Sequence, residues 1–122
     1  MQNMIFKKFQ SFKFAFNGIL LGFKEKNFVL QTVIAFLAIG LGIYFKISVY
    51  EWISILICCS TVLSLELINT SIEHTINLIT KEQNKNVGKI KDIAAGAVLM
   101  SSIFSLIIGI IIFAPKIYSI IH

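Results

Sequence analysis

Residues 64–78, with the sequence SLELINTSIEHTINL, place two carboxylates and two amides inside an otherwise apolar stretch. These four side chains are spaced three, four and four residues apart and belong to Glu66, Asn69, Glu73 and Asn77. Positions at such spacings share one face of an α-helix, so the stretch predicts a helix with a single polar face. A charged side chain in hydrocarbon costs roughly 2.5–3.5 kcal/mol on insertion scales, and such residues usually face a bundle interior and serve a function. The alternative interpretation is a buried polar cluster that only fixes the register of the helix.

The composition of the chain is that of an integral membrane protein, and its length fits a single domain over residues 1–122. Of the 122 residues, 57% are hydrophobic and only 14% are charged, whereas a soluble domain is nearer a quarter charged. The eleven basic residues are all lysine, and the net charge is +5. The absence of arginine argues against nucleic-acid binding, since contacts to bases and phosphates favour arginine. Cys58 and Cys59 are adjacent in an apolar run, where we expect buried thiols.

Four helical segments are expected along the chain. The first mixes lysines with phenylalanines that step by three or four residues, a pattern typical of an amphipathic helix at the membrane surface. The other three contain apolar runs long enough to cross a hydrocarbon core of about 30 Å. The expected fold is therefore an all-α integral membrane protein with a surface helix over about 3–24 and spans over about 28–45, 50–80 and 90–114. Pro115 is expected to end the last span, and residues 81–91 are expected to form a basic polar loop.

The lysines set the expected orientation. Five lie in the N-terminal segment and four in residues 81–91, against one each in the 46–51 turn and the C-terminal tail. By the positive-inside rule, the N-terminus and the long loop face the cytoplasm. Trp52 is an aromatic residue of the kind that marks the opposite interface, which puts the cytoplasmic interface about 20 residues further on. Glu73 then lies at that interface and Glu66 about 9 Å below it, at 1.5 Å per residue.

These residue types together favour phosphoryl transfer to a lipid hydroxyl. Carboxylates and an amide suit a hard cation such as Mg²⁺, which keeps waters and substrate phosphates as further ligands. The lysines of residues 81–91 suit phosphate, and a carboxylate below the interface can accept a proton from an alcohol. A P-loop is absent, because Gln83 stands where a motif ending in Gly88 and Lys89 would need glycine. His74 is expected to point away from the polar face and to be structural.

The run ELINTSIEH at residues 66–74, followed by KDIAAGAVL at 91–99, resembles the signature of the small prokaryotic diacylglycerol kinase family. The resemblance covers nearly the whole chain. It implies an ATP- and Mg²⁺-dependent lipid kinase of the bacterial cytoplasmic membrane, a homotrimer of three-span protomers that share active sites. With Leu65 before the first glutamate and His74 after the second, the sequence of this motif is more similar to that of undecaprenol kinases. Undecaprenol is therefore the expected acceptor, and diacylglycerol is the alternative.

The resemblance also implies roles for individual residues. Glu66 matches the general base of the family, and Glu73 and Glu25 match its metal ligands. Residues expected in the nucleotide site are Asn69, Glu82, Lys91 and Asp92.

The residues alone leave two other classes of protein possible. An ion-conducting or transport oligomer would line a polar path with the same helix face. A structural or regulatory membrane subunit would not need this set of carboxylates, amides and lysines. The polar groups gather at one end of the 50–80 helix, which favours a site over a pore.

Overall fold

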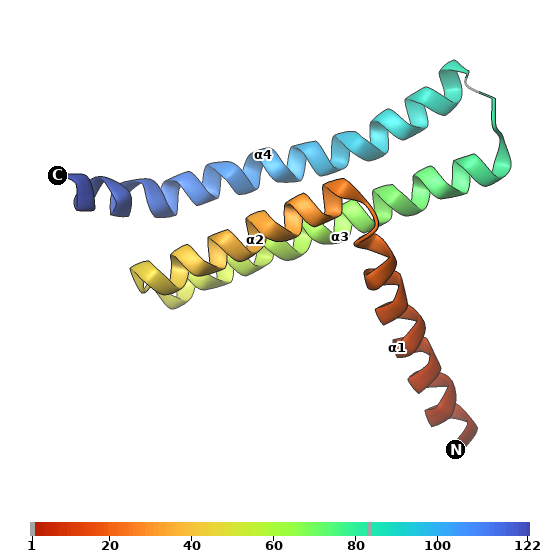
Figure 1. Cartoon of the computed structure of the whole chain (residues 1–122), viewed down its shortest axis with the longest axis horizontal. Coiled ribbons are helices and arrows are strands. Elements are labelled where there is room, and N and C mark those ends of the chain that lie inside the picture. Colours follow the sequence, from red (N-terminus) through yellow and green to blue (C-terminus); the bar gives the residue numbers. More distant parts are fainter. Residues whose placement is uncertain (1, 83) are drawn as a thin grey trace.

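The computed structural model describes residues 2–82 and 84–122, and in this part of the chain it consists of four α-helices. They are α1 (Gln2–Gly22), α2 (Lys26–Phe45), α3 (Val49–Ile79) and α4 (Lys85–Ile121). The last three form an elongated bundle, while α1 leaves it steeply where α2 begins, beside the middle of α3 (Figure 1). Each of these three is long and apolar enough to cross a membrane. The expected all-α membrane fold is confirmed, and the first three expected ranges agree with the helices to within two residues.

Local backbone chemistry makes the corner between α2 and α3. Lys46 ends α2 in the left-handed conformation (φ 51°, ψ 55°), and its N–H donates to the carbonyls of Gly42 and Ile43. Ser48 then begins α3 through a capping box. Its hydroxyl accepts from the N–H of Glu51 at 3.2 Å, and the Glu51 carboxylate accepts from the N–H of Ser48 at 3.0 Å. So short a corner makes α2 and α3 antiparallel neighbours.

The connection between α3 and α4 is shorter than the loop expected over residues 81–91. Asn84 caps α4, because its side-chain oxygen accepts from the N–H of Val87 at 2.9 Å, and the helix begins at Lys85. The expectation of a basic loop reaching residue 91 is therefore wrong. The consequence for the site is that Lys91 lies on a helical turn, in a fixed direction relative to α3.

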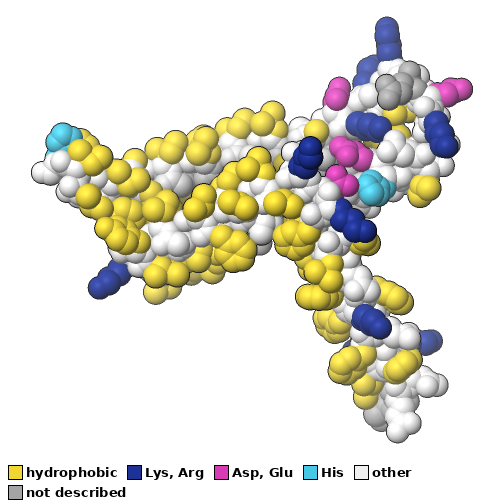
Figure 2. All heavy atoms as spheres, in the orientation of Figure 1, with side chains coloured by type: hydrophobic (Ala, Val, Ile, Leu, Met, Phe, Trp, Pro, Cys, Tyr) yellow, Lys and Arg dark blue, Asp and Glu magenta, His cyan; other side chains and the backbone are white. Residues whose placement is uncertain are grey.

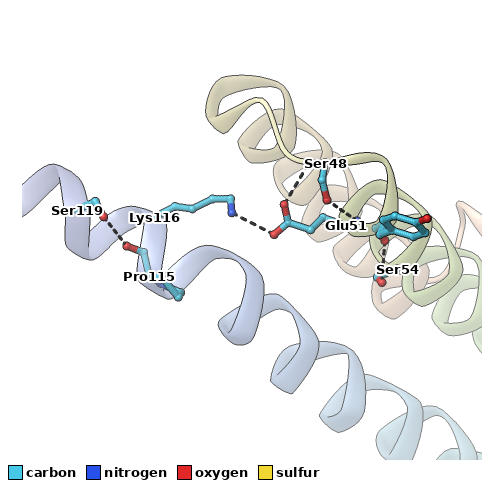
Figure 3. A network of polar contacts seen from close by, with 7 residues as sticks. Ser48, Glu51, Ser54, Pro115, Lys116 and Ser119 are labelled. Carbon is cyan, nitrogen blue, oxygen red and sulfur yellow. Dashed lines mark hydrogen bonds and ion pairs between the residues drawn. The ribbon is translucent and has the colours of Figure 1, made fainter.

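α4 also continues through Pro115 to Ile121, so the expected end of the last span at residue 114 is wrong as well. Proline removes one helical N–H, but membrane helices tolerate it where neighbouring groups hold the following turn. Here the ammonium of Lys116 pairs with the carboxylate of Glu51 at 3.0 Å, and the Ser119 hydroxyl donates to the Pro115 carbonyl at 3.1 Å (Figure 3). These contacts stabilise the last turns of α4 against the first turn of α3.

α3 is the central helix of the bundle. It packs most extensively against α4, then against α2, and meets only the end of α1. An apolar cluster lies at the end of the bundle away from α1 and consists of Ile47, Ile55, Ile112 and Phe113, with Trp52 packed against it. A Cβ atom on Gly42 would lie 2.7 Å from the Trp52 ring, so glycine permits this close approach of α2 to α3. The apolar core that holds the helices together therefore lies at this end, and the polar residues lie away from it.

α1 is joined to the bundle through its C-terminal end alone. Gly22 is its one buried residue, and a Cβ atom there would lie 2.5 Å from Cδ2 of Leu67 on α3. The phenylalanines along α1 are exposed, as an interfacial helix requires. The contact of Gly22 with Leu67 brings the turn that carries Glu25 beside the part of α3 that carries Glu66.

Candidate active site

The polar face predicted for α3 exists, and its burial decreases toward the end of the helix. Among the described residues, Glu66 and Asn69 are the two buried polar side chains, with 4% and 7% of their surfaces exposed. Glu73, one turn further on, is partly buried, and Asn77 is exposed. The face therefore leads from a buried carboxylate to a solvent-accessible amide, as expected for a site that lies just below an interface.

Asn69 lies between Glu66 and Glu73 on the polar face and contacts Glu73. Its amide nitrogen lies 3.4 Å from a carboxylate oxygen of Glu73, a long hydrogen bond. Its side-chain oxygen is buried and has no hydrogen-bond partner within the described residues. A buried oxygen left in this state is costly, and such atoms usually mark the place of a water, an ion or a ligand. The donor atoms of this face are thus oxygens, the type that hard divalent cations prefer.

Glu25 comes to this face from a different part of the chain. It occupies the turn between α1 and α2, and its carboxylate oxygen lies 3.4 Å from Nε2 of His74 on α3. The charges of Glu25 and Glu73 both act on Glu66, so the three carboxylates form one electrostatic group. Sequence spacing gave no means to bring Glu25 here. His74 lies one position beyond Glu73, off the column of polar residues, and it meets Glu25 on that neighbouring side of α3.

Lys91 joins the same face from α4. Its ammonium donates to the side-chain oxygen of Asn77 at 3.0 Å, one turn beyond Glu73. Asp92 follows it on α4 and is exposed, and Glu82 is exposed in the connection between α3 and α4. The structure therefore brings Lys91 to the end of the polar face, and it gives Glu82 no contact with the other predicted residues in the described part of the chain.

The charged side chains concentrate at the end of the bundle where α1 joins it. Figure 2 shows acidic, lysine and histidine side chains together in this region, while the rest of the bundle is mostly hydrophobic on the visible face, with a lysine and a histidine at its opposite end and further lysines along α1. Within residues 2–82 and 84–122, no three His, Cys, Asp or Glu side chains approach closely enough to hold a metal ion by themselves. A cation at this site would therefore need ligands from a substrate, from water or from another protomer.

The fold is that of a membrane protein with three long apolar helices, and its acidic side chains gather around one accessible region of the bundle. Residues 13–113 match the family model described as prokaryotic diacylglycerol kinase. The chain is 38% identical to undecaprenol kinase of Bacillus subtilis (strain 168) over 116 residues, which cover 94% of each chain. It is 29% identical to diacylglycerol kinase of Synechocystis sp. over 111 residues, which cover 89% of this chain and 63% of that protein.

The chain belongs to the prokaryotic diacylglycerol kinase family and is a lipid kinase. Its substrates are accordingly a lipid and ATP, and kinases of this kind typically use a divalent metal ion. The three apolar helices make it a multi-pass membrane protein. The predictions of fold class, family and lipid kinase activity are confirmed, and the transporter and structural-subunit alternatives are not supported.

Proposed function

We propose that the protein phosphorylates the hydroxyl group of undecaprenol with ATP, with Glu66 as general base. The observation that carries this proposal is the burial of the Glu66 carboxylate next to two further carboxylates, at the end of the bundle where the lysines gather. A general base must come within about 3 Å of the proton that it takes, and a lipid hydroxyl enters from the membrane side, where Glu66 lies. Glu66 accepts the hydroxyl proton as the lipid oxygen attacks the γ-phosphorus of ATP and ADP leaves.

The nucleotide and its metal occupy the accessible end of the polar face in this proposal. Glu25 and Glu73 hold Mg²⁺, for which carboxylate oxygens with phosphates and waters form a suitable set of ligands. When bound, the metal neutralises charge on the transferring phosphoryl group. Lys91 offers a positive charge to the phosphates, and Asn69 orients Glu73 through its amide. The remaining contacts to the nucleotide are assigned to Glu82 and Asp92.

Undecaprenol is favoured over other lipids by the side chains around Glu66. Most side chains within four residues of it along α3 are apolar, including Leu63, Leu65, Leu67 and Ile68, with the hydroxyl of Thr70 and the amide of Asn69 among the polar groups. Diacylglycerol carries two ester carbonyls close to its hydroxyl, and a buried carbonyl without a donor costs roughly 1–3 kcal/mol. Undecaprenol has no such groups, so the surroundings of Glu66 suit it better. The 38% identity to an undecaprenol kinase supports the same choice.

One observation favours the alternative acceptor, diacylglycerol. A cavity of about 340 Å³ lies between α2, α3 and α4, and it reaches Val62 and Leu63, one turn deeper than Glu66. Gln31 and Ser102 line it, and the Ser102 hydroxyl is buried without a hydrogen-bond partner in the described residues. Two such donors are the groups that ester carbonyls would need.

The assembly and the orientation are part of the proposal. We assign the lysine-rich end of the bundle to the cytoplasm, where ATP is present, in the inner membrane of a bacterium. We assign a homotrimer with active sites shared between protomers, and a second protomer would supply the ligands that one protomer lacks. The whole of residues 1–122 then forms one membrane-embedded kinase domain.

The test is a kinase assay with purified protein in mixed micelles, with Mg-ATP and either undecaprenol or diacylglycerol at matched surface concentrations. A higher kcat/KM for undecaprenol supports the proposed acceptor. Equal or faster turnover of diacylglycerol contradicts it and supports the alternative. If folded protein phosphorylates neither of these lipids, and no other lipid alcohol either, the proposed function itself is contradicted.

A further inference from the structure

The side chain of Glu25 is directed away from the helix that it precedes. Glu25 is the N-cap residue of α2, with an extended backbone (φ −94°, ψ 129°), yet within the described residues its carboxylate makes no capping hydrogen bond. Instead its oxygen Oε1 lies 3.4 Å from Nε2 of His74 on α3. An N-cap side chain normally satisfies the first N–H groups of its own helix. The carboxylate of Glu25 is therefore available to α3 and to whatever binds there.

Something must hold Glu25 in that position. The charges of Glu25 and Glu73 both act on Glu66, and like charges repel. Glu25 lies in a turn and its side chain is 41% exposed, so rotation into solvent is open to it. Among the described residues, the imidazole of His74 is the side chain that makes a polar contact with this carboxylate. The contact opposes the repulsion and keeps Glu25 near α3.

The pair also forms part of a cleft. A cleft of about 610 Å³ lies between the C-terminal end of α1 and α3, and both Glu25 and His74 line it. Its walls include Ile19 and Leu67, while Thr70 and Ser71 add hydroxyl groups. Leu67 follows the buried Glu66 on α3, so the cleft that Glu25 and His74 line adjoins the part of α3 that carries the proposed base.

We propose that His74 is a positioning residue, which holds the Glu25 carboxylate toward α3 so that it can serve as a metal ligand. This inference rests on the proposed function, because it deepens the role given there to Glu25. Partners that orient metal ligands from behind typically contribute about 10–100-fold to metal affinity. His74 is 67% exposed, so we expect an effect at the lower end of that range. The alternative is that His74 only fastens the α1–α2 corner to α3.

The experiment compares His74→Ala, His74→Gln and Glu25→Gln with the full-length protein, each in two measurements. The first is binding of Mn²⁺ by electron paramagnetic resonance, with a non-hydrolysable ATP analogue and without lipid. The second is the Mg²⁺ concentration for half-maximal kinase activity. His74→Ala is expected to weaken both by about tenfold, and His74→Gln, whose amide nitrogen can replace Nε2, is expected to restore most of the loss. Thr75→Val is the matched control, because Thr75 is exposed on the same turn and, within residues 2–82 and 84–122, its hydroxyl bonds only to the carbonyl of Ser71 on its own helix.

A double variant distinguishes the proposed role of His74, positioning the Glu25 carboxylate, from the alternative role of holding the α1–α2 corner against α3. In the Glu25→Gln background, His74→Ala is expected to cause no further loss of metal binding, because His74 acts through Glu25. Unchanged Mn²⁺ binding in a folded His74→Ala protein overturns the inference, as does a full additional loss in the Glu25→Gln background. These results are distinct from failure of the proposed function, which an inactive wild-type protein would show, and from failure of the Glu25 assignment, which an unaffected Glu25→Gln variant would show.

Discussion

The ammonium of Lys91 donates to the side-chain oxygen of Asn77 at 3.0 Å, and this contact joins the beginning of α4 to the end of α3. Asn77 lies one turn beyond Glu73 on the polar face. Because an amide is neutral, it orients the lysine without cancelling its charge. The arrangement presents a full positive charge at the accessible end of a row of carboxylates, which is where the phosphates of ATP are proposed to bind.

Loss of Asn77 is expected to affect ATP more than the chemical step. Asn77→Ala removes the acceptor that orients Lys91, so the KM for ATP is expected to rise by about threefold to tenfold, the value of one hydrogen bond to a charged group at a partly exposed site. The kcat is expected to change less. Steady-state kinetics at saturating lipid measure both, with Asn86→Ala, another exposed asparagine at this end, as the control. Equal losses in Lys91→Met and Lys91→Met/Asn77→Ala proteins would show that the amide acts through the lysine. Additive losses would contradict that role.

Glu66→Gln is expected to lower kcat by roughly 10²-fold or more, because the amide cannot take the hydroxyl proton. Glutamine has nearly the same shape, so the bundle should form normally. Glu51→Gln is the matched control, since Glu51 lies on the same helix at the opposite end and touches no proposed site residue. Near-normal turnover by a folded Glu66→Gln protein would end the assignment of this residue as the base.

Glu73→Gln is expected to raise the Mg²⁺ concentration that half-maximal activity requires and to weaken binding of Mg-ATP. The reason is the loss of one charged oxygen from the few that this chain offers to a cation. Titration with Mg²⁺ at fixed ATP measures the shift, and Glu25→Gln should shift the curve in the same direction. An unchanged titration in the Glu73 variant would place the cation elsewhere.

The ion pair at the end of the bundle away from the proposed site allows a test of stability that should not affect catalysis. Lys116 and Glu51 pair at 3.0 Å across α4 and α3, with both side chains mostly covered (Figure 3). Lys116→Met removes the pair but keeps the length of the side chain, so the apparent Tm in detergent is expected to fall while kcat stays near normal. Lys46→Met, at the same end, removes a lysine without an ion pair in the described residues and is the control. A Tm equal to that of the control would show that the pair contributes nothing measurable.

The helices were predictable where a long apolar run defines them. The uncharged run after Phe28 marks α2, and the apolar run after the 46–51 turn marks α3, which the structure begins with the capping box of Ser48 and Glu51. Two boundaries were missed. Asn84 is an N-cap inside a segment that reads as polar loop, and only its bond to Val87 distinguishes the two. Pro115 usually ends a helix, but the pair of Lys116 with Glu51 depends on the packing of α4 against α3, which local sequence does not contain.

Residue spacing predicted the site only along α3, whereas Glu25 and Lys91 were expected there only through the family resemblance. The spacing of Glu66, Asn69 and Glu73 puts them on one face, since helix periodicity alone decides this. No spacing rule connects that face with Glu25, which precedes it by forty residues or more and arrives through the contact of Gly22 with Leu67. The contact of His74 was missed because a residue next to Glu73 in sequence points away from the polar face of the helix. Its partner, Glu25, lies on that other side, in the α1–α2 corner. The periodicity of a single helix cannot reveal a contact with another element.

The orientation of the bundle in the membrane is the last prediction. Nine of the eleven lysines lie in residues 7–26 and 81–91, that is in α1, the α1–α2 corner and the region where α3 connects to α4, while Lys46 and Lys116 lie at the opposite end of the bundle. The positive-inside rule therefore puts Asn86 in the cytoplasm and His122 outside. Single cysteines at these two exposed positions, in a protein with Cys58→Ala and Cys59→Ala, report the sides through a membrane-impermeant maleimide. Labelling of His122→Cys in intact spheroplasts, and of Asn86→Cys only after permeabilisation, is the expected result. The reverse pattern would separate Glu66 from cytoplasmic ATP and would contradict the proposed site, because its phosphoryl donor is found on one side of the membrane only.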